Sequence, residues 1–112
     1  MKVIKKLNEN FVCEDAHGGS GSRKLLLAEK EMKNVQGMTR GFLPAGSKFD
    51  WHNHDKLNEV MYVLKGNGSV RDEDGIYPYN TGDVFIFPEG IYHEIENTSE
   101  KENEYIFMRV YQ

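Results

Sequence analysis

Short runs of β-branched, aromatic and aliphatic residues alternate with turn residues along almost the whole chain. Many short strands at regular spacing, separated by Gly-, Pro-, Asn- and Asp-containing turns, are typical of an all-β sandwich or barrel. The segment LLLAEKEMK, residues 25–33, is the one that could form a short helix. The expected strands cover residues 3–7, 23–29, 35–43, 48–52, 59–66, 68–72, 76–79, 83–88, 91–95 and 103–112. We therefore predict an all-β fold.

Length and charge narrow the class of protein. A chain of 112 residues is expected to form a single domain, residues 1–112. The net charge of -4 and the scattered basic residues argue against a nucleic-acid partner. No apolar run approaches the ~20 residues that cross a membrane, and the first ten residues lack a signal-peptide core. With Cys13 as the single cysteine, we expect a cytoplasmic protein.

Half of the four histidines lie within three residues. In WHNHDKLNE, residues 51–59, His52 and His54 stand two apart, and Glu59 follows at the start of the next expected strand. Residues two apart share one face of a strand. Imidazole and carboxylate groups are donors that first-row transition metals accept. The spacing makes a metal site plausible.

A third histidine, His93, belongs to the expected strand IYHEIE, residues 91–96. Alternation places Ile91, His93 and Ile95 on one face and the two glutamates on the other, solvent-facing one. An inward histidine needs a partner, because a buried polar group without one is costly. A hydrogen-bonded core histidine is the common explanation, and a fourth metal ligand is the alternative.

Two stretches resemble the two sequence motifs of the cupin superfamily. The first is GSKFDWHNHDKLNEVMYVLKG, residues 46–66, and the second is GDVFIFPEGIYHEIEN, residues 82–97. Each stretch matches its motif in every fixed position, and the two occur in the family's order. The resemblance covers nearly half of the chain, and the flanking strands carry no diagnostic pattern.

The resemblance implies a double-stranded β-helix, the RmlC-like jelly-roll barrel, and one divalent metal at its centre. By the motif positions, the ligands would be His52, His54, Glu59 and His93, and none of them is missing. The resemblance also implies a homodimer. The ligand set does not distinguish iron, manganese, nickel, copper and zinc.

Four protein ligands on an octahedral ion leave two positions open, which suits a small polar or anionic molecule that chelates through two atoms. The first hypothesis is a metal-dependent enzyme of oxygenase, isomerase, decarboxylase or lyase type. The alternative is a non-catalytic module that binds a sugar or a small acid. Fold alone does not choose between them.

Two further residues are candidates for catalysis. His17 belongs to EDAHGGSGSR, residues 14–23, which is either a flexible connector or a lid that brings His17 to the substrate or the metal. Arg40 lies among apolar neighbours in VQGMTRGFL, residues 35–43. If its face points inward, Arg40 could clamp a substrate carboxylate or phosphate. If it points outward, it is a surface arginine whose stem covers the barrel wall.

Overall fold

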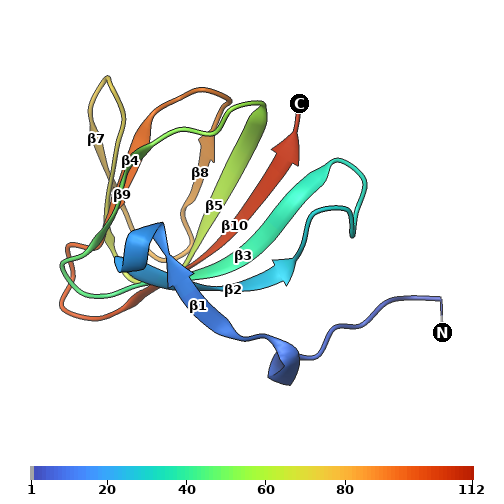
Figure 1. The fold of residues 1–112 in the computed structure, drawn as a ribbon. Helices are drawn as coiled ribbons and strands as arrows, with labels where there is room; N and C mark the ends of the chain where they lie inside the picture. Colours follow the sequence, from blue (N-terminus) through green and yellow to red (C-terminus); the bar gives the residue numbers. More distant parts are fainter. Residues whose placement is uncertain (1) are drawn as a thin grey trace.

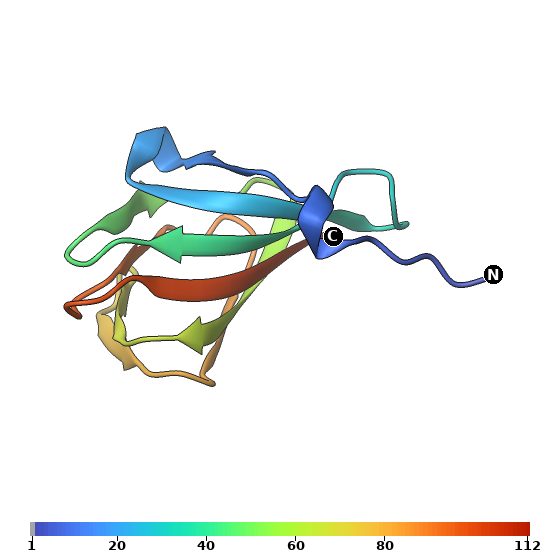
Figure 2. The same cartoon turned by 90° about the horizontal axis from the view of Figure 1, so that it is seen from below.

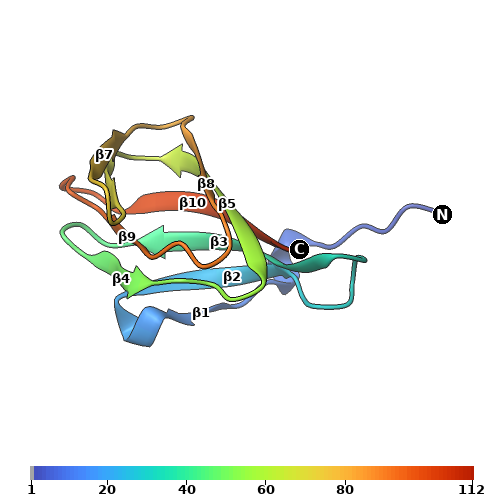
Figure 3. The same cartoon turned by 90° about the horizontal axis from the view of Figure 1, so that it is seen from above.

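A computed structural model describes residues 2–112 as two antiparallel sheets that enclose a jelly-roll interior (Figure 1). The larger sheet has the order β1-β2-β3-β10-β5-β8, and the smaller has the order β4-β9-β6-β7. In Figure 3, β1 and β2 lie at one edge of the larger sheet, and β8 lies at the other. The strand bounds are β1 Cys13–Ala16, β2 Gly21–Leu27, β3 Val35–Leu43, β4 Lys48–His52, β5 Leu57–Lys65, β6 Gly68–Arg71, β7 Ile76–Tyr79, β8 Val84–Phe87, β9 His93–Glu96 and β10 Asn103–Tyr111.

This architecture confirms the all-β jelly roll, with corrections near the N-terminus. Residues 3–7, expected as a strand, carry no regular structure, and β1 was not anticipated. The strand expected at 23–29 is confirmed as β2, and the short helix that residues 25–33 could have formed is absent from the described chain. Leu25 and Leu27 pair with Thr39 and Met38 of β3, and the chain then turns. Tertiary pairing with β3 therefore overrides the helix propensity of this segment.

The segment before β1 contacts the barrel through Lys6, whose Nζ donates to the Leu26 carbonyl of β2 at 2.7 Å and pairs with Glu31 at 2.9 Å. The backbone of this segment runs outside the barrel, with one short 3-10 turn at Asn8–Asn10 (Figures 1 and 2). Among residues 2–112, no helix is long and apolar enough to cross a membrane.

The strands of the larger sheet have a buried inner face and a partly exposed outer face. In β3, burial alternates strictly from Val35 to Leu43. In β10, Asn103, Tyr105 and Phe107 are buried while the residues between them are partly exposed. This period of two is what a strand with one face on the core must show.

In the smaller sheet, β9 departs from simple alternation. His93 and Ile95 are buried as expected, but Ile91 precedes the strand and is 44% exposed. Glu94, expected in solvent, is buried on the outer face. Lys48 and Arg71 cover its carboxylate, at 3.5 and 3.4 Å. Two neighbouring cations therefore account for a buried charge that alternation alone places in water.

One end of the barrel, here called the closed end, is filled by a polar network around Tyr79, Tyr105, Asn97 and Asn103. The Asn103 amide donates to the Asn67 carbonyl at 2.8 Å and to the Tyr79 hydroxyl at 3.1 Å. Tyr79 donates to the Glu96 carbonyl at 2.8 Å. The two tyrosine hydroxyls also bond to each other.

A second part of the closed end depends on Asn97 and on a glycine. The Asn97 amide donates to the Leu43 carbonyl at 2.8 Å and to the Lys101 carbonyl at 2.7 Å. Gly66 has a φ of 109°, and a Cβ there would lie 1.7 Å from Oδ1 of Asn103. Only glycine fits this turn, because any side chain would collide with the buried amide.

Candidate metal centre

At the other end of the interior, here called the open end, the four motif residues come together. His52 ends β4, His54 lies in the turn that follows, Glu59 lies near the start of β5, and His93 opens β9. The pairing of β4 with β9 places His52 opposite His93. One ligand atom from each of the four side chains lies within 4.8 Å of all the others, so the group could hold a metal ion.

Backbone carbonyls fix the tautomers of two of these histidines. Nδ1 of His52 lies 2.6 Å from the Asp50 carbonyl oxygen, and Nδ1 of His93 lies 3.0 Å from the Ile91 carbonyl oxygen. Because a carbonyl only accepts, each Nδ1 must donate its proton. In the neutral ring, Nε2 then carries a free lone pair. Backbone or carboxylate bonds of this kind orient most metal-binding histidines.

Two buried nitrogens point at the Glu59 carboxylate without being satisfied by it. Nε2 of His54 lies 3.2 Å from Oε1 of Glu59, and Nε2 of His93 lies 3.5 Å from the same oxygen. Within the described chain, neither nitrogen has a hydrogen-bond partner of acceptable geometry. Buried polar atoms without partners are rare and costly. A cation between them and Oε1 would satisfy both, so the residues present fit a metal.

Glu59 is the charged centre of the open end. Its side chain is only 4% exposed, and Arg109 of β10 donates to its Oε2 at 3.2 Å. Burial alone would raise the pKa of the Glu59 carboxyl. The His54 imidazole and the Arg109 guanidinium outweigh burial and hold that pKa well below its ordinary value. Glu59 is therefore a carboxylate at neutral pH.

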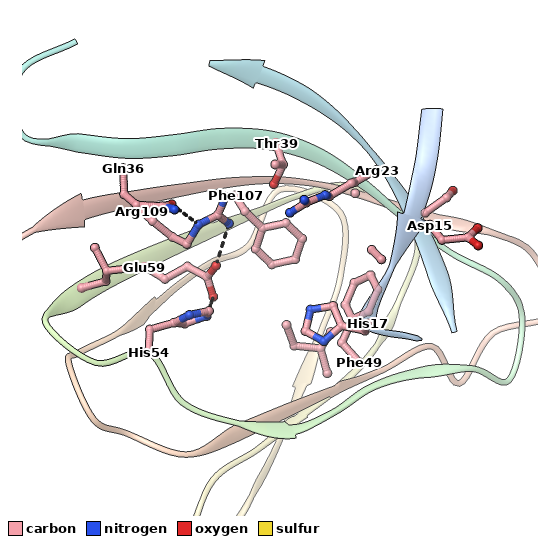
Figure 4. Close-up of a pocket in the computed structure, with 15 residues that line it drawn as sticks. Asp15, His17, Arg23, Gln36, Thr39, Phe49, His54, Glu59, Phe107 and Arg109 are labelled. Carbon is pink, nitrogen blue, oxygen red and sulfur yellow. Dashed lines mark hydrogen bonds and ion pairs between the residues drawn. The ribbon is translucent and has the colours of Figure 1, made fainter. Parts of the chain in front are cut away.

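A cavity of about 390 Å³ opens beside Glu59 and His54. Figure 4 shows Arg109, Gln36 and Thr39 on one wall, His17 and Phe49 on another, and Arg23 reaching in from β2. Two guanidinium groups and the apolar rings of Phe49 and Phe107 thus surround the space next to the four-residue cluster. A cavity of this size and composition suits a small molecule.

His17 lies at this cavity, where the lid hypothesis placed it. It belongs to a short 3-10 turn, His17–Gly19, and its ring lies 4.7 Å from both the His52 ring and the Phe49 ring. Burial, followed by the charge of His52, lowers the pKa of His17 from 6.5 to about 4. His17 is therefore a neutral imidazole against the open end.

Arg40 lies on the outer face of β3, so the hypothesis that it clamps a substrate inside the barrel is wrong. It forms an ion pair with Glu104 of β10, and its guanidinium lies 5.6 Å from the Phe42 ring. From Gly37 to Leu43 the inner positions of β3 are the odd-numbered ones, and the register shift at the start of the strand lets Gln36 reach the cavity as well. The alternative, a surface arginine on the barrel wall, describes its position.

The arginine that contacts Glu59 is Arg109, which the sequence analysis did not single out. Arg23, which lines the same cavity, was not singled out either. The position of Arg109 continues the inward series of Asn103, Tyr105 and Phe107 in β10. That alternation was readable in the sequence. It was not recognised because nothing in NEYIFMRVY says which of the two faces is inward.

The chain belongs to the cupin family: the family model for the cupin domain matches residues 40–109. This match includes the four clustered residues and Arg109.

Individual proteins are similar to this chain over more of its length than the family model covers. The chain is 34% identical over 92 residues to the oxalate-binding protein of Thermotoga maritima, covering 80% of this chain and 76% of that protein. A crystal structure from Thermotoga maritima, of a protein described as a predicted oxalate decarboxylase, superposes with a TM-score of 0.86 at 27% identity. It covers 97% of this chain and 100% of that one. A sugar phosphate isomerase of the cupin superfamily from Silicibacter pomeroyi has a TM-score of 0.81 at 18% identity, covering 96% and 76% of the two chains, and it supports the fold alone.

Proposed function

We propose that this cupin holds one divalent transition metal and binds a small chelating carboxylate of the oxalate class at that metal. The ligands would be His52, His54, Glu59 and His93. Iron, manganese, nickel, copper and zinc all accept three imidazoles and one carboxylate. The observation that carries the proposal is the pair of buried, unpartnered Nε2 atoms of His54 and His93 beside the Glu59 carboxylate.

The surroundings of the cluster support an anionic ligand. Arg109 and Arg23 line the cavity, but Glu59 and Asp15 line it too and Arg23 pairs with Glu14 at 3.0 Å, so the positive charge comes from the divalent ion, which one carboxylate does not neutralise. A pocket with net positive charge attracts small anions and raises their local concentration. The name of the Thermotoga maritima relative, oxalate-binding protein, supports a dicarboxylate for this chain as well.

We propose further that the protein acts on the bound anion as an enzyme, within the oxygenase, isomerase, decarboxylase or lyase range. A bound metal supplies Lewis-acid polarisation and a fixed orientation for the ligand. Arg109 and Arg23 would orient its carboxylates, Phe49 and Phe107 would exclude water, and neutral His17 could accept or return a proton. Binding without turnover is the second candidate, favoured by the relative's name.

Elemental analysis and a ligand titration test this proposal. Untagged protein purified without chelators should hold about one transition metal per chain, and Glu59→Ala should hold almost none. The metal-loaded protein should bind oxalate more tightly than acetate, which offers only one carboxylate. A parent protein that refuses every divalent metal would sink the metal centre. Incubation with oxalate, followed by NMR detection of products, separates the enzyme from the passive binder.

The homodimer and the cytoplasmic location indicated at the sequence level remain predictions. Sedimentation at several protein concentrations measures the first, and fractionation of source cells measures the second.

A further inference from the structure

The two oxygens of the Glu59 carboxylate face different partners. Oε1 is the oxygen beside Nε2 of His54 and His93, at 3.2 and 3.5 Å. Oε2 instead accepts a hydrogen bond from Nη1 of Arg109 at 3.2 Å (Figure 4). One carboxylate oxygen therefore faces the proposed metal position, and the other accepts a hydrogen bond from a guanidinium.

Arg109 is itself held in place from a second side. Its Nε donates to the Gln36 side-chain oxygen at 2.7 Å, so the guanidinium bridges β3 and β5 from its position on β10. The strand register puts Arg109 directly opposite Glu59 on one neighbour and opposite Gly37 on the other. A Cβ at Gly37 would lie 3.1 Å from Nη2 of Arg109, so the glycine leaves the space that the guanidinium fills. The side chain is only 12% exposed, and its orientation is fixed by these neighbours.

We infer that Arg109 is a positioning residue of the metal centre, which holds Oε2 so that Glu59 offers the metal one oxygen and not two. A free carboxylate can bind a cation through both oxygens. A charge-assisted hydrogen bond to Oε2 competes with that second contact. On a six-coordinate ion, three imidazoles and one carboxylate oxygen leave two positions for a chelating ligand, whereas a bidentate Glu59 leaves one. This inference rests on the proposed function.

The positive charge of Arg109 should also favour binding of a chelating dicarboxylate. It lies at the cavity beside the ligand position and compensates the negative charge that Glu59 brings to the centre. A dianionic ligand therefore meets a more positive site than the four ligands alone would provide. Arg109 should accordingly matter more for a chelating dicarboxylate than for a monocarboxylate.

An ion pair on the outer face of the same sheet supplies a matched control. Arg40 and Glu104 form an ion pair between β3 and β10, as Arg109 and Glu59 do between β10 and β5, but on the outside of the barrel. The test compares Arg109→Met and Arg109→Lys with Arg40→Met. Metal content, oxalate affinity and acetate affinity are measured by elemental analysis and calorimetry. The number of water molecules on bound Mn²⁺ is measured by magnetic resonance.

Arg109→Met should keep its metal but bind oxalate at least about ten-fold more weakly, with acetate affinity changed less than about three-fold. The water count on Mn²⁺ should fall from two in the parent to one. Arg109→Lys should lie between the two, because its ammonium keeps the charge but loses the fork that reaches both Gln36 and Glu59. Arg40→Met should match the parent in every measurement.

The outcomes separate this inference from the proposal beneath it. A parent that binds no metal overturns both. A parent that binds metal and oxalate, with an Arg109→Met variant that binds oxalate equally well, overturns the inference alone. Loss of metal from folded Arg109→Met also overturns it, because retention of the metal is assigned to the four ligands. If Arg109→Met does not fold, Gln36→Leu decides: weaker oxalate affinity with metal retained supports the inference, and unchanged affinity overturns it.

Discussion

The closed and open ends of the barrel interior both bury polar side chains, but the two ends differ in how far those side chains are hydrogen-bonded. At the closed end, the Asn97 and Asn103 amides and both tyrosine hydroxyls are hydrogen-bonded to one another or to backbone carbonyls. At the open end, Nε2 of His54 and of His93 has no hydrogen-bond partner among residues 2–112, although both atoms are buried. The same strand, β10, contributes Asn103 to the first end and Arg109 to the second.

This difference is the one expected between polar groups that stabilise the fold and polar groups that bind a ligand, as we propose for the open end. A fully satisfied network contributes rigidity and a defined core. Unpartnered groups lower the stability of the metal-free protein and return that free energy when a cation binds. We therefore expect mutations at the closed end to change folding, and mutations at the open end to change binding.

The largest expected effect concerns metal-dependent stability at the open end. A divalent metal at about a thousand times its Kd should raise the free energy of unfolding of the parent by about 4 kcal/mol. Glu59→Ala should lose this gain, because the remaining imidazoles lack the carboxylate that compensates the ion. Urea unfolding with and without metal measures it.

Glu94→Ala is the control for that experiment. Glu94 is also a buried glutamate, but it lies on the outer face against Lys48 and Arg71. This variant should keep the full metal-dependent gain. An equal gain in Glu59→Ala would contradict the assignment of the two ends.

The second effect is a loss of folding stability at the closed end. Asn103 is fully buried, and Asn103→Ala removes the donors to the Asn67 carbonyl and to the tyrosine hydroxyls. Leaving buried acceptors unsatisfied should cost about 2–3 kcal/mol of unfolding free energy in the metal-free protein. Metal affinity should stay within about two-fold of the parent. A variant that loses metal affinity but keeps its stability would reverse the comparison.

A smaller effect is expected at His17, on the edge of the open end. His17→Ala should keep its metal and weaken oxalate binding by about three- to ten-fold, the worth of one ordinary hydrogen bond. His52→Ala is the matched variant and should lose metal. The two are compared by elemental analysis and calorimetry. Unchanged oxalate affinity in His17→Ala would assign residues 17–19 to a connector and not a lid.

The smallest effect is a pH dependence of stability from the closed end. Burial raises the pKa of Tyr105 and of Tyr79 above the ordinary value of 10. Both hydroxyls are protonated in folded and unfolded chains below about pH 10, so their contribution is fully present there. Above it, the unfolded chain loses these protons first, and the free energy of unfolding should fall as pH rises. Tyr105→Phe should flatten that fall between pH 9 and 11 in urea unfolding, and an unchanged slope would contradict it.

Several strands of the barrel and the four clustered residues could be predicted from the sequence. The bounds of β3, β4 and β7 follow directly from VQGMTRGFL, KFDWH and IYPY. The spacing of His52, His54 and Glu59 made a metal site plausible, the resemblance to the cupin motifs implied His93 as the fourth ligand, and the four side chains do converge. Alternation predicted that His93 points inward, and it is 1% exposed.

Other features could not be predicted locally. Local pattern allowed both a strand at 23–29 and a short helix at 25–33, and the pairing of Leu25 and Leu27 with β3 decided for the strand. Glu94 is buried because Lys48 and Arg71 arrive from two other strands. The pairing of Leu25 and Leu27 and the burial of Glu94 both depend on residues from other strands, which a local sequence pattern does not show.

By itself, the sequence determined the strand pattern and the turns between strands, because these depend on short-range periodicity. Through its resemblance to the two cupin motifs, it also indicated the four side chains able to hold a metal. Only the tertiary structure decided which arginine contacts Glu59. Arg40 and Arg109 both lie in apolar strands, and the pairing of β10 with β5 places Arg109 on Glu59 across fifty residues of chain. Arg40 is left outside on Glu104. The choice depends on strand register and on which face of the sheet closes over the core, and both are set by contacts between distant strands.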